Sequence, residues 1–375
     1  MIPLCKPFID EECISQVVGV LKSGVLSLGP KLKEFEQKFA NLIGTKYAIG
    51  VNSGTSGLHL CIRALGIRKG DEVITTPFSF VASSNCILYE NATPVFVDVE
   101  EDSFNLNPEK IEAAITPKTK ALVIAHIFGQ SCNMTRIMEI AQKHNLKVIE
   151  DACESIIATH HEKQVGTFGD VAVFAFYPNK QMTTGEGGMI VTNNSEIHEY
   201  CASATNQGRS DNMQWLTHDK LGYNYRLDEM SAALGIAQLD KIYFLIGKRK
   251  EIANLYLQEL SEIEGLFLPK IQPGNVSTWF VFPIRVKESL RDKLIQKLND
   301  RGVQSKAYFC PCIHLQPFYI RKFNYQKGMF PIAEKLSRET LVLPFFPQLE
   351  RKQIEEIKTV LKESLAELKN DVEET

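Results

Sequence analysis

The stretch FAFYPNKQMTTGEGGMIV, residues Phe174–Val191, decides how the rest of the chain is interpreted. An apolar run ends, Pro178 turns the chain, and Lys180 follows in a loop that closes on the glycines of GEGG before a second apolar run. A lysine in such a turn is most often a surface residue. At the end of a buried strand it can instead be a nucleophile, because loss of water favours its uncharged amine. Glycines permit backbone close to a ligand.

Short apolar segments on both sides of this loop predict a sheet. They alternate with stretches of helical periodicity, Asn107–Ile115 and Thr135–Asn145, which is typical of an α/β fold with a mostly parallel sheet covered on both faces. The short loop after Phe176 predicts an antiparallel pair, and hence a mixed sheet. The predicted strands are Asp71–Phe78, Thr93–Val99, Lys120–Phe128, Leu146–Ala152, Asp170–Phe176 and Gly188–Asn194.

The remainder of the chain predicts a second, smaller α/β domain. A helix-rich bridge spans Arg226–Ile263, and it is followed by an apolar strand around STWFVFPIRV and a closing amphipathic helix that starts at Arg351. We therefore expect a large domain over residues 1–242 and a small one over residues 243–375.

Composition narrows the classes of function. With 375 residues and a net charge of −3, the chain has no basic excess that would indicate nucleic acid as a partner. It has no apolar run of membrane-spanning length, and its acidic start does not resemble a signal peptide, so we expect a cytoplasmic protein. Its nine cysteines are scattered, and the one close pair, Cys310 and Cys312, has the spacing of neither a zinc site nor a redox motif. No metal is expected.

Three further segments stand where strands should end, which is where α/β proteins bind ligands. NSGTSGLHLCIRAL begins a helix with Gly54, Thr55 and Ser56, whose amides and hydroxyls suit a phosphate, although an ordinary helix cap explains them equally. Asp151 ends an apolar run and either binds a cationic ring nitrogen or caps the next helix. Phe80 either stacks on a flat ring or belongs to the core. Together with Lys180, these are the groups that hold pyridoxal 5′-phosphate (PLP).

In this order, the motifs resemble those of the DegT/DnrJ/EryC1/StrS family of PLP-dependent sugar aminotransferases, perosamine-synthase-like members included. The blocks SLGP, NSGTSGLHL, GDEVITTPFSFVAS, EDACES, GTFGDVAVFAFYPNKQMTTGEGG, LGYNYRLDEMSAALGIAQL and HLQPFY carry the resemblance over nearly the whole chain. It implies the fold of PLP-dependent transferases of type I, like aspartate aminotransferase. A dehydratase subgroup of this fold carries His at the lysine position, so Lys180 favours transamination.

The resemblance also implies roles for individual residues. Lys180 holds the cofactor covalently, Asp151 pairs with its ring nitrogen, and Phe80 covers one face of the ring. The phosphate lies on Gly54, Thr55 and Ser56, Glu154 lies near the 3-hydroxyl, and Asn224 reaches the phosphate of a neighbouring subunit in a homodimer. His314 and Tyr319 are candidate substrate contacts, with packing at the domain interface as the alternative.

The expected reaction is transfer of an amino group, with glutamate as donor, to a nucleotide-linked keto-deoxysugar, at C4 in preference to C3. One position departs from the family pattern: Ala175 stands where many relatives have a serine whose hydroxyl contacts the cofactor phosphate. The alternatives are another PLP-dependent activity on the same fold and a PLP-binding sensor without catalysis. A dinucleotide oxidoreductase is disfavoured, because the chain lacks the glycine-rich fingerprint.

Overall fold

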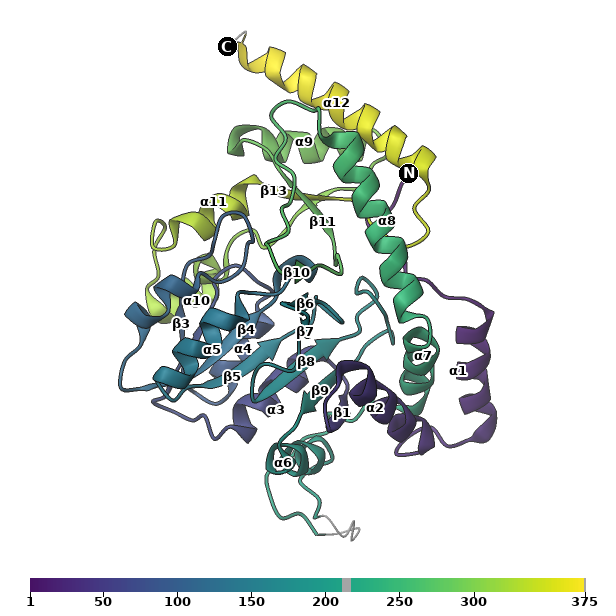
Figure 1. Ribbon diagram of the computed structural model, residues 1–375, viewed down its shortest axis with the longest axis vertical. Helices are drawn as coiled ribbons and strands as arrows, with labels where there is room; N and C mark the ends of the chain where they lie inside the picture. Colours follow the sequence, from purple (N-terminus) through teal and green to yellow (C-terminus); the bar gives the residue numbers. More distant parts are fainter. Residues whose placement is uncertain (211–216, 374–375) are drawn as a thin grey trace.

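The apolar segments of the first part of the chain pair into one seven-stranded sheet (Figure 1). The computed structural model describes residues 1–210 and 217–373. The strand order is β1-β9-β8-β5-β4-β2-β3, and β9 runs antiparallel to both of its neighbours while the other pairs are parallel. The strands are β1 (Tyr47–Val51), β2 (Glu72–Thr75), β3 (Thr93–Phe96), β4 (Thr119–Ala125), β5 (Lys147–Asp151), β8 (Val171–Ala175) and β9 (Gly188–Thr192).

All six predicted strands are present, and the antiparallel pair of β8 and β9 is confirmed. Strand β1 was not predicted. The helix predicted over Asn107–Ile115 is wrong, because the structure has only two short 3-10 turns there, Pro108–Lys110 and Glu112–Ala114.

Helices cover both faces of the sheet, as expected. Along β8 the apolar side chains alternate: Val171 and Val173 pack with helices of one face, and Ala172 and Phe174 with those of the other. One face carries α3 (Gly54–Ala64), α4 (Ala82–Tyr89) and α6 (Ser195–Thr205); the other carries α2 (Pro30–Ile43), α5 (Met134–Lys143) and α7 (Glu229–Leu239).

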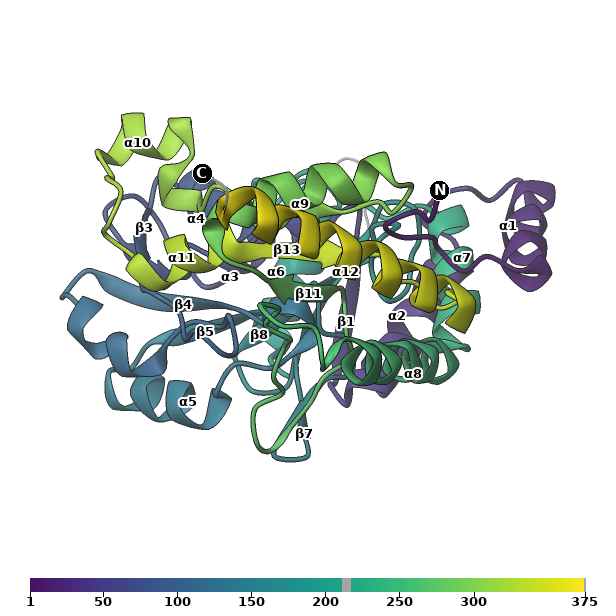
Figure 2. The same ribbon diagram turned by 90° about the horizontal axis from the view of Figure 1, so that it is seen from above.

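The C-terminal part builds a second core around a three-stranded antiparallel sheet, in the order β11-β13-β12. The long helix α8 starts beside α7 and leads into this part, and α12 lies across it (Figures 1 and 2). Its elements are α8 (Ile242–Leu260), β11 (Phe282–Arg285), α9 (Glu288–Asp300), β12 (Lys306–Ala307), α10 (Pro317–Phe323), α11 (Pro331–Glu339), β13 (Thr340–Leu343) and α12 (Arg351–Glu373).

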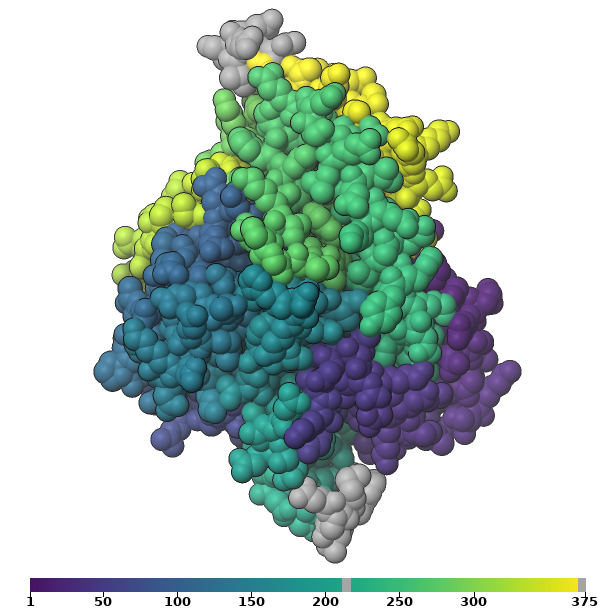
Figure 3. Space-filling view, in the orientation of Figure 1, coloured from purple at the N-terminus to yellow at the C-terminus, as the bar shows by residue number. Residues whose placement is uncertain are grey.

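The N-terminal residues cross to this smaller part. Ile2 bridges to Val303 and belongs to the C-terminal core, and the backbone N–H of Leu4 donates to the side chain of Gln304 at 2.9 Å. The first residues of the chain therefore pack with the C-terminal part, and the division into domains at residues 242 and 243 stays a prediction. Helix α1 (Glu11–Ser23) then returns to α7, and the two parts meet along a broad junction (Figure 3).

A third sheet joins β10 (Asn275–Val276), β6 (Thr159–His160) and β7 (Lys163–Gln164). Within residues 1–210 and 217–373, no helix combines the length and apolar character needed to cross a membrane.

A buried carboxylate joins α7 to the start of α2. Glu229 accepts hydrogen bonds from the backbone N–H groups of Gly29 at 3.0 Å, Lys31 at 2.7 Å and Leu32 at 3.0 Å. These N–H groups have no partner within the helix, and no other side chain caps α2. A Cβ at position 29 would lie 2.6 Å from a carboxylate oxygen of Glu229, so any larger residue than Gly29 would displace that side chain.

We expect Glu229→Gln to lower the free energy of unfolding by about 1–3 kcal/mol, because its amide would face a backbone N–H instead of accepting from it. Chemical denaturation followed by circular dichroism measures this. Glu34→Gln is the matched control, since the ion pairs of Glu34 with Lys31 and Lys38 are exposed, and it should change stability by less than about 1 kcal/mol. Equal losses in the two variants would contradict the capping role.

Candidate active site

A cavity of about 580 Å³ lies beyond the carboxyl ends of β4, β5 and β8, and the C-terminal part closes one side of it. Six of the residues predicted from the sequence line this cavity, although they come from segments far apart in the chain. They are Gly54, Thr55, Phe80, Asp151, Glu154 and Lys180.

Lys180 reaches the cavity from the loop after β8. Its backbone N–H donates to the carbonyl of Tyr177 at 2.9 Å, which forms the turn that Pro178 begins. Its ammonium Nζ lies 3.6 Å from Oε1 of Glu154 and 4.0 Å from the centroid of the Phe280 ring. The amine is thus held between a carboxylate and an aromatic face at the cavity wall.

Asp151 is the last residue of β5 and is largely buried. Its Oδ2 accepts a hydrogen bond from the Ser83 hydroxyl at 2.6 Å, and its Oδ1 accepts from the backbone N–H of Cys153 at 3.3 Å. These two donors orient the carboxylate at the cavity. The alternative of a simple helix cap does not describe this geometry, because residues 152–158, directly after Asp151, form turns and no α-helix.

Glu154 is also buried, and its Oε2 accepts from the backbone N–H of Phe128 at 3.0 Å. Burial raises the pKa of the Glu154 carboxyl, and the neighbouring Lys180 ammonium partly opposes that effect. Gln181 donates to the backbone carbonyl of Glu154 and so ties this segment to the lysine loop.

The start of α3 forms the predicted cradle. Ser53 is the cap, and its hydroxyl accepts from the backbone N–H of Ser56 at 3.1 Å. The Ser56 hydroxyl bonds to Asn52 at 2.7 Å, and Ser56 is not among the residues that line the cavity. The hydroxyl-bearing residues of this turn that do line it are Ser53 and Thr55.

Ala175 lines the cavity directly beside this turn. A Cβ added to Gly54 would lie 2.8 Å from the Cβ of Ala175, so only glycine fits at position 54. On another wall Phe80 is 65% exposed, which makes it one of the most exposed large apolar side chains of the described chain. A core phenylalanine, the alternative considered for Phe80, would be buried.

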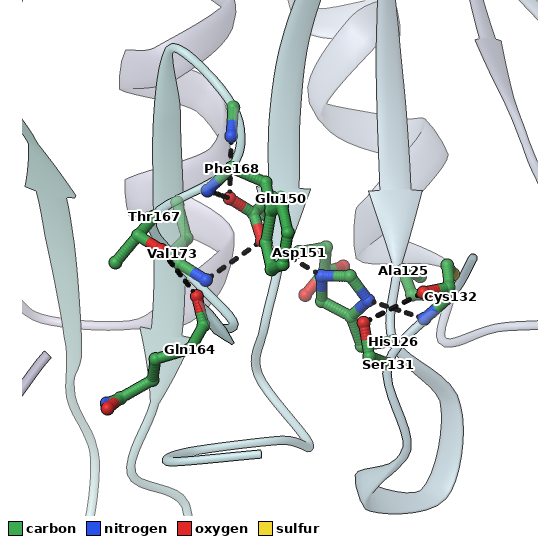
Figure 4. A network of polar contacts seen from close by, with 12 residues as sticks. Ala125, His126, Ser131, Cys132, Glu150, Asp151, Gln164, Thr167, Phe168 and Val173 are labelled. Atoms are coloured by element: carbon green, nitrogen blue, oxygen red, sulfur yellow. Dashed lines mark hydrogen bonds and ion pairs between the residues drawn. The ribbon is translucent and has the colours of Figure 1, made fainter. Parts of the chain in front are cut away.

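A buried polar network lies under this site (Figure 4). The carboxylate of Glu150 accepts from the backbone N–H groups of Gly166, Phe168 and Gly169, each at 2.8 Å, and bonds to His126 Nε2 at 3.2 Å. Since His126 Nδ1 accepts from the backbone N–H of Cys132 at 3.1 Å, the ring proton lies on Nε2. His126 lines the cavity, and the network fixes the orientation of its ring.

Three predicted residues lie elsewhere. Asn224 is outside the cavity of its own chain, between Tyr223 and Tyr225. His314 is fully buried, with Nε2 3.1 Å from Glu334, and Tyr319 is buried with its hydroxyl 2.6 Å from Ser84. Neither side chain lines the cavity, and contact of either one with substrate stays a prediction. His314 is a packing residue in this structure, and Tyr319 only borders a neighbouring hollow.

Arg249, on α8, is a contributor that the sequence did not reveal. It is 3% exposed and donates through Nη2 to the carbonyl of Lys180 at 3.2 Å and through Nη1 to the carbonyls of Trp279 at 3.3 Å and Phe280 at 3.2 Å. Burial lowers the pKa of its guanidinium to about 10. One side chain thus holds both the backbone of Lys180 and the residue whose ring faces its amine.

Comparisons with known proteins identify the family of this chain and its cofactor. The family model for the DegT/DnrJ/EryC1/StrS aminotransferase family matches residues 7–362. The chain belongs to this family. It is an enzyme with transaminase activity, and the cofactor is PLP, which solved neighbours hold in that form or in its pyridoxamine form. The predicted type I fold is confirmed.

Individual relatives are similar over almost their whole length. GDP-perosamine synthase of Escherichia coli O157:H7 is 36% identical over 94% of this chain and 95% of its own. The dTDP-3-amino-3,4,6-trideoxy-alpha-D-glucose transaminase of Streptomyces venezuelae is 36% identical over 92% of this chain and 93% of its own. The crystal structure of S. venezuelae DesV superposes with a TM-score of 0.91 at 35% identity, covering 96% of this chain and 98% of that one.

We expect Arg249→Met to lower kcat by about 10- to 100-fold, because small displacements of a reacting group have effects of that size. The absorbance spectrum of the PLP-loaded enzyme should also titrate at a different pH. Arg249→Lys should restore part of the activity. Arg321→Met, on the exposed side of α10, serves as the control. An Arg249→Met variant that is less stable but has unchanged kcat and spectrum would contradict this role.

Proposed function

We propose that this transaminase transfers an amino group from glutamate to C4 of a nucleotide-linked keto-deoxysugar. One observation carries the proposal: the amine of Lys180, the carboxylate of Asp151 and the start of α3 meet in a single cavity. The named activities of the relatives support a nucleotide sugar as the acceptor. The choice of C4 rests on the likeness of the lysine loop and the HLQPFY block to perosamine-synthase-like members.

The residues of the cavity fit PLP, since they supply each type of group that the cofactor needs. Lys180 would hold it covalently, and Asp151, already oriented by Ser83, would pair with the ring nitrogen. The N-terminus of α3 with Thr55 would bind the phosphate, and Phe80 would cover the ring. Gly54 and Ser56 shape this turn, and Glu154 would face the 3-hydroxyl.

When bound, the cofactor supplies an electrophilic carbon that accepts the amino group and a ring that accepts electrons. The residues of the chain then act on protons. The Lys180 amine takes the proton from the α-carbon of the donor and returns it to the carbon that received the amino group. Asp151 keeps a proton on the ring nitrogen by a charge-assisted hydrogen bond. Glu154 holds the lysine ammonium close to the site between these steps.

A cytoplasmic homodimer is part of the proposal, with Asn224 contributing to the partner's site. Side chains of α3 hold the two tyrosines on either side of Asn224. Arg63 Nη1 donates to the Tyr223 hydroxyl at 2.8 Å, and the Tyr225 hydroxyl lies 3.1 Å from His59 Nδ1. The two tyrosine rings stack with their centroids 4.8 Å apart. A residue that is firmly supported and yet lies outside its own cavity suits a role across a subunit boundary.

Lys180→Ala is the decisive test of the proposed chemistry. We expect loss of turnover, and loss of the absorbance band of the lysine-bound cofactor even when PLP is added. Wild-type enzyme should lose that band with L-glutamate and regain it with a keto-sugar nucleotide, and a panel of 3-keto and 4-keto sugars identifies the position. A variant that keeps band and turnover would refute the role of Lys180. Recovery with 3-keto sugars alone would refute C4.

Ala175→Ser should strengthen cofactor binding. The Cβ of residue 175 faces the start of α3, so a hydroxyl there adds a donor beside the expected phosphate position. A hydrogen bond of ordinary strength lowers the Kd for PLP by about three- to tenfold. Equilibrium dialysis of the apoenzyme measures this, and Thr55→Val should shift the Kd in the opposite direction. An unchanged Kd in Ala175→Ser would show that the phosphate is already fully bound.

A further inference from the structure

The cavity is lined by more carboxylates than ammonium groups, although the proposed substrates are anions. Among the described residues that line it, three carry carboxylates, Asp151, Glu154 and Glu186, and two carry ammonium groups, Lys180 and Lys306. Both substrates of the proposed reaction are anions: an amino acid donor carries carboxylates, and a nucleotide sugar carries a diphosphate. Because Lys180 is engaged by the reaction itself, the binding of these anions depends on the second cation.

Lys306 lines the cavity, where its exposed side chain can contact a ligand. It stands on β12, opposite Val342 of β13, and the next residues along the chain, Ala307, Tyr308 and Phe309, also line the cavity. Its ammonium lies 5.1 Å from the centroid of the Tyr308 ring.

No ion pair to the Lys306 ammonium is present in the described residues. By contrast Lys335, on the neighbouring α11, binds Glu101 at 2.7 Å. An ammonium that borders a cavity lined by carboxylates, without a carboxylate of its own, remains available to an incoming anion.

We propose that Lys306 is the anion-binding and specificity-determining residue of this site, and that its ammonium binds a carboxylate or phosphate oxygen of the substrate. The inference rests on the proposed function for the identity of the substrates. The Tyr308 ring beneath the ammonium limits where it can move and stabilises its charge. Because the side chain is exposed, removing it leaves the fold and the lysine chemistry intact.

The experiment uses PLP-loaded enzyme and follows each half-reaction separately by absorbance. Wild type is compared with Lys306→Met, Lys306→Arg and the control Lys120→Met. Lys120 is an exposed lysine near the start of β4, at the opposite end of that strand from the cavity. One arm varies L-glutamate, and the other varies the keto-sugar nucleotide. A third measures binding of the free nucleoside diphosphates UDP, GDP and dTDP.

In Lys306→Met we expect KM to rise by about tenfold or more in one arm, with kcat changed by less than about threefold, because a charge-assisted contact is lost without disturbing the reacting groups. Arginine at this position should restore most of the affinity. A rise confined to glutamate identifies a carboxylate as the ligand. A rise for the sugar nucleotide, with weaker binding of the free diphosphates, identifies a phosphate.

Unchanged KM values in both arms, with unchanged binding of the diphosphates, would overturn the role of Lys306 and leave the transaminase reaction intact. Failure of the wild-type enzyme to react with glutamate or any keto-sugar would count against the proposed function instead. In that case binding of L-glutamate and of the free diphosphates decides the inference, which stands only if wild type binds one of them more tightly than Lys306→Met.

Discussion

The parallel pairing of β5 with β8 is the constraint on which the site depends. Asp151 lies opposite Val173 in this pair, and the backbone N–H of Ala152 donates to the Val173 carbonyl at 2.9 Å just beyond it. A slip of one residue would turn the Asp151 carboxylate to the other face of the sheet. The register therefore sets where the carboxylate stands relative to the loop that carries Lys180, and that loop begins only a few residues further along β8. Chemistry at this edge is possible because both strands end there together.

Buried carboxylates join other segments of the fold by accepting several backbone hydrogen bonds. Glu150 satisfies three backbone N–H groups of residues 166–169, and Glu229 satisfies three at the start of α2. Asp98 accepts from the N–H groups of Ile332 and Ala333 at the start of α11, and so joins the sheet to the C-terminal part. A buried carboxylate is costly unless its oxygens accept several hydrogen bonds, and each of these does. Without these hydrogen bonds the buried carboxylates would destabilise the fold. With them, the carboxylates fix how the segments pack against one another.

The sequence revealed those parts of the site whose signal is local. Apolar runs marked the strands that lead to Lys180 and Asp151, and the Gly/Ser/Thr composition marked the turn at Gly54, although the strand before that turn was not predicted. Phe280 and Arg249 were not predicted. They contact Lys180 from about 100 and 69 residues away in the chain, and no local sequence pattern marks such a contact. The helix expected over Asn107–Ile115 is replaced by two 3-10 turns, in which the backbone N–H of Ile111 bonds to Pro108 and that of Ala114 to Ile111. The sequence left open whether His314 contacts substrate or packs in the interior, since it does not show which way a side chain points; the ring lies buried beside Glu334.

One helix serves two distant parts of the molecule. The N-terminus of α3 forms the cradle with Thr55, and its second turn carries His59, with Arg63 one turn further on. Both bind Glu90, His59 at 2.8 Å and Arg63 at 3.0 Å, and they also hold the tyrosines on either side of Asn224. Because α3 is buried along most of its length, it cannot shift at one end without moving the other. The cradle and the Asn224 loop are therefore placed by the same rigid element, so a change that moves α3 displaces both together.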